Sequence, residues 1–249
     1  MDEQEKKYLA LDNWFLTAQG NRVAHAFAAE LMQVAEQFSG QNLLQLGSCG
    51  ENLWLPLFKF KNKWIATPST IPNKSSLTSS INQLPIDRDS IDCIIAPLTI
   101  EAFAKGKSTI DEIDRILKPM GHAIFFGINP FSFWGAAFHL GCVSPFNKDS
   151  QLALSSSLTL KHALLNRGYR ICAYTNIFYI PPVRSPYLIK KLEFLNEMGK
   201  MIWPFPAGFY CIIVQKYQYC LPSLKQVIAE PVPVNQKVAL QGIGKYIHD

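Results

Sequence analysis

Helix and strand patterns alternate along most of this chain, and that alternation limits the fold more than any other feature. Apolar residues recur at spacings of three and four in residues 22–38, which predicts an amphipathic helix. Buried-strand patterns follow in residues 42–46, 63–66, 91–96, 122–128 and 208–216. Interleaved strands and helices are typical of a parallel sheet with crossover helices, so we predict an α/β fold with a doubly wound, mostly parallel sheet.

The helices between these strands have recognisable ends. Residues 108–118 carry an apolar face, and Pro119 and Gly121 stop that helix before the next strand. Residues 157–174 repeat the order of helix, glycine and strand. The chain has 249 residues, of which 48% are hydrophobic, so it can bury a large core. We expect an N-terminal helical cap at residues 1–40, a main domain at residues 41–217 and a loosely attached tail at residues 218–249.

Composition disfavours several classes of protein. A net charge of +5 without a concentrated basic run predicts no stable nucleic-acid binding. Six cysteines lack a C-x-x-C pair and five histidines lack metal-ligand spacing, so we predict no metal site. Residues 121–143 are apolar, but Asn129 and Pro130 interrupt them, which predicts a strand, a turn and a helix and no transmembrane segment. The first residues lack an apolar signal core, which favours a cytoplasmic protein.

Four loops follow the predicted strands, and they are where a ligand is expected. In doubly wound sheets, ligands bind at the carboxyl ends of the strands. The residues at these ends are Gly47–Gly50, Thr67–Pro68, Ala96–Glu101 and Gly127–Ser132. We expect the four loops to share one cleft.

Three stretches resemble class I S-adenosylmethionine-dependent methyltransferases of the type 11 kind. They are "LLQLGSCGEN" at residues 43–52, "LPIDRDSIDCIIAPLTIE" at residues 84–101 and "EIDRILKPMGHAIFFGINPFSFWG" at residues 112–135. The runs "WFLTAQG", "PPVRSPY" and "WPFPAGFY" further resemble a narrower group of small bacterial methyltransferase-like proteins.

That resemblance implies a Rossmann-like, seven-stranded sheet, mostly parallel, with an antiparallel last strand and helices on both faces. It also implies S-adenosyl-L-methionine as the cofactor. The cofactor contacts that it implies are Gly47, Ser48, Gly50, Thr67, Asn82, Ala96 and Pro97. The candidate substrate contacts are Glu101, which keeps the position of an acid common in the family, Asn129 and Ser132 after the fifth strand, and Trp134. No catalytic residue is assigned.

The first of these stretches departs from the family's pattern. Gln45 stands where an acid is usual, and Cys49 and Glu51 stand where further glycines are usual. Residues 52–86 contain no Asp or Glu, so the acid that binds the cofactor's ribose after the second strand is missing. A carboxylate there would accept two charge-assisted hydrogen bonds, so its absence predicts weaker or altered cofactor binding.

Two functions stay open at this point. One is an S-adenosylmethionine-dependent methyltransferase whose substrate is a hydrophobic small molecule. That substrate class follows if aromatic residues wall the cleft, the candidates being Phe131, Phe133, Trp134, Phe138, Trp203, Phe205, Phe209 and Tyr210. The eroded cofactor motif favours instead a catalytically inactive module that binds or regulates a partner protein. A nicotinamide-dependent oxidoreductase is disfavoured, because Cys49 and Asn52 stand where G-x-G-x-x-G needs glycines.

Overall fold

The computed structural model describes residues 3–70, 75–103, 108–141, 156–183, 185–201 and 206–217. The chain divides into two units, Met1–Gln218 and Tyr219–Asp249, and every described residue belongs to the first unit. The tail predicted at residues 218–249 therefore lies outside the described residues, and its loose attachment stays a prediction.

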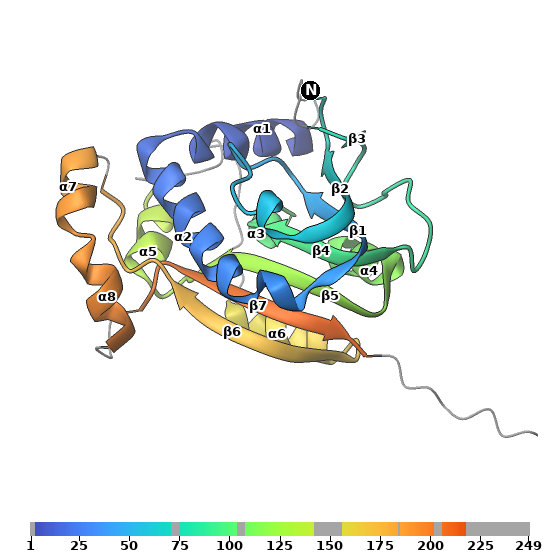
Figure 1. The fold of residues 1–249 in the computed structure, drawn as a ribbon. Coiled ribbons are helices and arrows are strands. Elements are labelled where there is room, and N and C mark those ends of the chain that lie inside the picture. Colours follow the sequence, from blue (N-terminus) through green and yellow to red (C-terminus); the bar gives the residue numbers. More distant parts are fainter. Residues whose placement is uncertain are drawn as a thin grey trace, which may run out of the picture. The chain divides into compact units, whose positions relative to one another are not determined.

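Seven strands form one sheet in the order β3-β2-β1-β4-β5-β7-β6 (Figure 1). They are β1 (Ser39–Leu46), β2 (Lys59–Thr67), β3 (Leu77–Thr78), β4 (Ile91–Pro97), β5 (Leu117–Ile128), β6 (Tyr169–Ile177) and β7 (Phe209–Lys216). The pairs from β3 through β5 run parallel, whereas β7 runs antiparallel to both β5 and β6. The predicted fold, a doubly wound and mostly parallel sheet with an antiparallel last strand, is confirmed.

Helices connect and cover the strands. In the described part of the chain they are α1 (Glu3–Phe15), α2 (Ala18–Val34), α3 (Thr99–Phe103), α4 (Ser108–Ile116), α5 (Phe133–His139), α6 (Ser157–Leu165), α7 (Pro186–Lys191) and α8 (Phe194–Met201), with short 3-10 turns η1 (Ala35–Gln37) and η2 (Leu55–Leu57). The helix predicted at residues 22–38 begins earlier, at Ala18, because the Thr17 side chain accepts a hydrogen bond from the backbone N–H of Gly20 and caps it.

Both faces of the sheet carry an apolar core. The apolar face of α2 packs with Leu43 and Phe126 on one side of the sheet. Helices α4 and α6 pack with Leu44 and Phe125 on the other side (Figure 1). Neighbouring strand residues go to opposite sides because successive side chains of a strand point to opposite faces.

Some element boundaries differ from the sequence prediction. β2 begins at Lys59 rather than at residue 63. The sequence does not reveal this first part, because the buried Phe60 is flanked by exposed residues and the segment lacks a continuous apolar run. β5 begins at Leu117, which pairs with Ile91, so the preceding helix is shorter than predicted and ends at Ile116. Helices α7 and α8 have no predicted counterpart, since they are only six and eight residues long.

The apolar segment at residues 121–143 has the predicted order of strand, turn and helix as far as residue 141, where the described part of it ends. It contains the end of β5, a turn at Asn129 and Pro130, and α5. Within the described ranges, no helix is long and apolar enough to cross a membrane.

Candidate functional site

The turn after β1 has a backbone that depends on its glycines. Gly47 and Gly50 adopt positive φ angles of 88° and 58°, which residues with side chains rarely adopt. The backbone N–H of Gly47 donates to the carbonyl oxygen of Ala66 at 2.7 Å, which ties the turn to the end of β2. Every residue from Gly47 to Gly50 is buried. The predicted glycine turn is therefore present at the carboxyl end of β1.

Gln45, which replaces the usual acid, braces this turn from inside the protein. Its side-chain nitrogen donates to the carbonyl oxygen of Gly47 at 2.8 Å and to Oδ1 of Asn52 at 2.6 Å. Its side-chain oxygen accepts a hydrogen bond from Nε1 of Trp54 at 2.8 Å. The same Asn52 oxygen also accepts the backbone N–H of Cys49 at 2.9 Å. An amide donates and accepts at once, which an ionised carboxylate does not do, so this network explains the glutamine.

Gln45→Leu is expected to lower the free energy of unfolding by about 3 kcal/mol, because it leaves the buried Nε1 of Trp54 without its acceptor and removes the donor to the carbonyl oxygen of Gly47 and to Oδ1 of Asn52. Chemical denaturation followed by fluorescence measures this change. Gln41→Leu is the matched control, since Gln41 is exposed on the same strand and its replacement should change stability by less than about 0.5 kcal/mol. Equal effects of the two substitutions would contradict the bracing role.

Helix α1 lies over the outer side of the turn (Figure 1). Oδ1 of Asp12 accepts hydrogen bonds from the Ser48 hydroxyl at 2.7 Å and from the backbone N–H of Gly50 at 2.8 Å. The Tyr8 ring lies against Gly47, where an added Cβ atom would come within 2.2 Å of Tyr8 Cε1. The turn is thus filled from outside by two side chains of α1.

Tyr8 also reaches the loop after β4. Its hydroxyl lies near the Thr99 side chain, and burial raises the pKa of Tyr8 well above its usual value. The Thr99 hydroxyl in turn donates to the carbonyl oxygen of Leu46 at 3.4 Å. The preceding residue, Leu98, is fully buried with a positive φ of 50°. Helix α1 therefore bridges the carboxyl ends of β1 and β4, which are neighbours in the sheet.

Comparisons with known proteins agree with this overall fold. A family model described as a methyltransferase domain matches residues 60–125. A methyltransferase from Thermotoga maritima that depends on S-adenosylmethionine is 17% identical, with a TM-score of 0.57 over 86% of this chain and 98% of its own. N-methyltransferase NodS from Bradyrhizobium japonicum, solved with S-adenosyl-L-homocysteine, is 10% identical, with a TM-score of 0.56 over 86% of this chain and 100% of its own.

A third similar structure comes from the complex between the Haloferax volcanii Trm112 methyltransferase activator and a methyltransferase. It is 14% identical, with a TM-score of 0.60 over 88% of this chain and 99% of the matched chain. The chain has the class I methyltransferase fold. The resemblance stated from the sequence is confirmed at that level, while the narrower bacterial group stays a prediction. A search of curated proteins found no match to the chain.

The residues at the class I cofactor position do not accommodate S-adenosylmethionine as they are arranged. The resemblance stated from the sequence implies that the methionine end lies against backbone N–H groups of the glycine turn, and here the N–H of Gly50 already bonds Asp12. The space above Gly47 holds the Tyr8 ring. After β2, where an acid is usual, Thr67 is fully buried and its hydroxyl donates to the carbonyl oxygen of Ser69 at 2.6 Å. The cofactor would need Tyr8 and Asp12 to move.

The other predicted cofactor contacts lie in packed surroundings. Oδ1 of Asn82 accepts a hydrogen bond from the Thr109 hydroxyl at 2.7 Å. Ala96 and Pro97 are buried in β4, where they pair with Phe125 and Phe126 of β5. None of these contacts tests cofactor binding, so the role of the seven predicted cofactor contacts, Gly47, Ser48, Gly50, Thr67, Asn82, Ala96 and Pro97, stays a prediction.

Glu101 is the buried acid nearest the carboxyl ends of β4 and β5. It lies in the first turn of α3, and its Oε1 accepts the backbone N–H of Ile128 at 3.0 Å. Its carboxyl group is also hydrogen bonded to the Tyr210 hydroxyl. Burial raises the pKa of Glu101 to about 7. The carboxyl therefore joins α3 to β5 and β7, and its predicted contact with a substrate stays a prediction.

Asn129 and Ser132 shape the turn that follows β5. Oδ1 of Asn129 accepts the backbone N–H of Phe131 at 3.1 Å. The Ser132 hydroxyl donates to the carbonyl oxygen of Asn129 at 2.6 Å and accepts the N–H of Gly135 at 3.1 Å, which makes Ser132 the N-cap of α5. Both side chains thus serve the local structure, as Asn-Pro turns and helix caps commonly do.

The aromatic residues predicted to line a cleft differ in their exposure. Trp134 and Phe138 are buried in the core, with Nε1 of Trp134 donating to the carbonyl oxygen of Ile180 at 2.7 Å. Phe131 and Phe133, by contrast, are 80% and 59% exposed. Phe209 and Tyr210 are core residues of β7, and Trp203 and Phe205 lie outside the described residues. Trp134 therefore packs in the core here rather than facing an open cleft.

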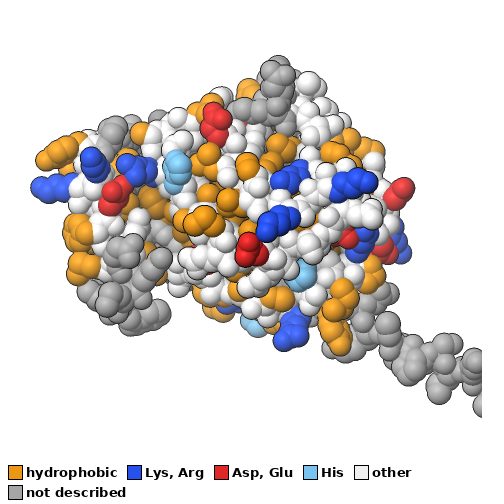
Figure 2. Space-filling view, in the orientation of Figure 1, with side chains coloured by type: hydrophobic (Ala, Val, Ile, Leu, Met, Phe, Trp, Pro, Cys, Tyr) orange, Lys and Arg blue, Asp and Glu red, His pale blue; other side chains and the backbone are white. Residues whose placement is uncertain are grey.

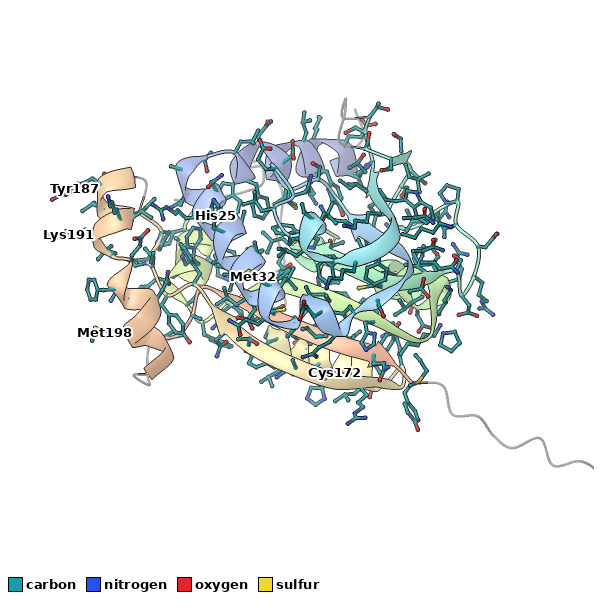
Figure 3. The ribbon with its side chains drawn as sticks, viewed as in Figure 1. His25, Met32, Cys172, Tyr187, Lys191 and Met198 are labelled. Carbon is teal, nitrogen blue, oxygen red and sulfur yellow. The ribbon has the colours of Figure 1, made fainter. Side chains whose placement is uncertain are left out.

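An apolar cavity of about 140 Å³ is a candidate site for a hydrophobic ligand. It lies beside α5 and α8 and is lined by Phe133, Tyr179, Pro181, Leu195, Met198, Gly199 and Pro206. On the neighbouring α7, Tyr187 points away from the protein (Figure 3). No group of three or more His, Cys, Asp or Glu in the described segments could hold a metal ion.

Tyr8 and Asp12 are the site residues missing from the sequence prediction. Tyr8, Leu11 and Phe15 recur at spacings of three and four, which predicts one buried face for this helix. Nothing in that spacing says which part of the protein the face covers.

Proposed function

We propose that this protein is an S-adenosylmethionine-dependent methyltransferase that acts on a hydrophobic small molecule. The observation that supports the proposal is the glycine turn of Gly47 and Gly50 at the carboxyl end of β1, between β2 and β4. Doubly wound sheets bind their ligands in this place. NodS, which shares the fold, was solved with the product form of the same cofactor. The cytoplasmic location predicted from the sequence is part of this proposal.

The substrate class is proposed from the apolar cavity beside α5 and α8. Its lining is hydrophobic apart from the Tyr179 hydroxyl and the protein backbone. The cavity has a volume of about 140 Å³, whereas typical ligand pockets have about 300 Å³ or more. It therefore fits one ring or a short chain of a larger molecule. Lysine and arginine side chains on the face in Figure 2 are interspersed with acidic and hydrophobic ones, which is why nucleic acid is not the proposed substrate.

A second candidate function is a catalytically inactive module that binds or regulates a partner protein. It is favoured by the filled turn, where Tyr8 and Asp12 contact the predicted cofactor-binding residues Gly47 and Gly50, and by the neutral Thr67 at the end of β2. The Haloferax volcanii structure of the same fold contains a protein activator, so a protein partner fits this candidate too.

Calorimetric titration with S-adenosylmethionine, and separately with S-adenosylhomocysteine, distinguishes the two functions. We expect saturable one-to-one binding of both ligands, weakened by the missing acid after β2. Adenosine alone is the control ligand, and it should bind more weakly because it lacks the methionine end. Folded protein that shows no binding up to millimolar ligand would overturn the methyltransferase proposal and leave the inactive module.

A further inference from the structure

We infer that α1 is an internal occupant of the cofactor site, with Asp12 and Tyr8 as the two residues that compete with S-adenosylmethionine. The inference rests on the proposed function, since it concerns the same turn after β1. It goes further by naming the part of the chain that controls access to the turn.

The Asp12 carboxylate has the chemistry of the group that it replaces. Its Oδ1 accepts the N–H of Gly50 at 2.8 Å and the Ser48 hydroxyl at 2.7 Å. The methionine end of the cofactor also carries a carboxylate, and class I enzymes hold that end at this turn. Asp12 is only 5% exposed, so both hydrogen bonds are shielded from water. The negative charge of the carboxylate strengthens them further. One anion at a time can use the N–H of Gly50.

Tyr8 fills the neighbouring space, one helical turn before Asp12. Its ring contacts Gly47 so closely that no atom fits between them, and its hydroxyl lies near Thr99 after β4. Residues four apart on a helix lie on one face, so Tyr8 and Asp12 enter the site together and leave it together. The occupant is therefore one face of α1 rather than a single side chain.

The end of α1 is anchored by aromatic packing, and its last residue, Phe15, lies beside Gly50 of the turn. The Trp14 ring packs edge-on to Trp134, with centroids 6.1 Å apart, and the Phe15 ring packs on Phe27 and Trp54. The Thr17 hydroxyl donates to the carbonyl oxygen of Trp14, which fixes the junction between α1 and α2. For the cofactor to bind, the first part of α1, up to Asp12, must therefore move off the turn while this end stays fixed. Molecules in which α1 stays on the turn do not bind the cofactor, so they lower its apparent affinity in proportion to their fraction.

The test is a titration with S-adenosylhomocysteine of the wild-type protein and two variants. Asp12→Ala removes the competing carboxylate and is expected to bind the ligand about tenfold more tightly, or better. Asn13→Ala is the matched control, because Asn13 is the exposed next residue of the same helix, and it should bind as the wild type does. Asp12→Asn keeps an acceptor oxygen without the charge, so its affinity should lie between those of wild type and Asp12→Ala.

Hydrogen exchange of the wild-type protein gives a readout that needs no variant. Saturation with S-adenosylhomocysteine should speed exchange in residues 3–12 while the turn at residues 47–52 stays protected. If the wild type binds the ligand but Asp12→Ala binds equally or less tightly, or exchange in α1 does not change, the inference is overturned and the proposed function stands. If the folded wild type binds no ligand up to millimolar concentration, the proposed function itself fails, and a folded Asp12→Ala that also fails to bind overturns the inference with it.

Discussion

Trp134→Ala is expected to lower the free energy of unfolding by about 4 kcal/mol. The side chain is 1% exposed, and its ring packs against Phe209 with centroids 5.0 Å apart and against Phe178 at 5.9 Å. The substitution also leaves the carbonyl oxygen of Ile180 without its 2.7 Å hydrogen bond from Nε1. Loss of a large buried ring creates a cavity that the surrounding sheet and helices fill only in part. Chemical denaturation gives the number directly.

Phe133→Ala is the matched control for this substitution. Phe133 is the preceding residue of α5 and is 59% exposed, so its replacement should change stability by less than about 1 kcal/mol. Because Phe133 lines the apolar cavity, that variant should instead weaken binding of a hydrophobic ligand. A Trp134→Ala protein that is as stable as the wild type, yet fails to bind ligand, would support the predicted contact of Trp134 with the substrate.

Stability is expected to fall as the pH rises from about 4.5 to about 7, because of Glu101. Burial raises the pKa of this carboxyl from 4.5 to about 7 in the folded protein. Between these values the folded state holds a proton that the unfolded state has released, so the free energy of unfolding decreases with increasing pH. One pKa unit corresponds to about 1.36 kcal/mol, so the whole loss is about 3 kcal/mol. It is absent below the lower pKa and complete above the upper one.

Denaturation curves of wild type and Glu101→Gln across this pH range test the effect. The amide has nearly the same shape and does not ionise, so the variant should lose this part of the pH dependence. Glu36→Gln is the control, because Glu36 is exposed and only pairs with Lys59 at the surface, and this variant should follow the wild-type curve. A Glu101→Gln curve with an unchanged slope would mean that Glu101 is ionised in the fold throughout.

The course of the chain follows from local patterns to a large degree. Residues 93–96 and 123–128 are continuous apolar runs, and they lie in the central strands β4 and β5. Strand ends are harder to predict where only one face is buried, as in β2, whose exposed lysines conceal its first half. Short α7 and α8 escape prediction because six or eight residues hold too few periods for a helical pattern.

Only the backbone turns of the candidate site could be predicted from the sequence. A glycine turn directly after a strand is a local feature, so the position of Gly47 and Gly50 follows from the sequence. The roles of Asn129 and Ser132 in a turn and a helix cap are local as well. The environment of Trp134 is different, because a single aromatic residue packs equally well in a core or beside a ligand, and the pattern around it does not distinguish them.

The sequence by itself determined most of the strands, the turn after β1 and the loss of the acid after β2, since each depends on residues that are neighbours along the chain. Only the tertiary structure decided what lies on that turn. Asp12 reaches Ser48 and Gly50 across 36 and 38 positions of sequence. A contact of that length is set by how α1, α2 and the sheet pack together, and no periodicity within either segment records it.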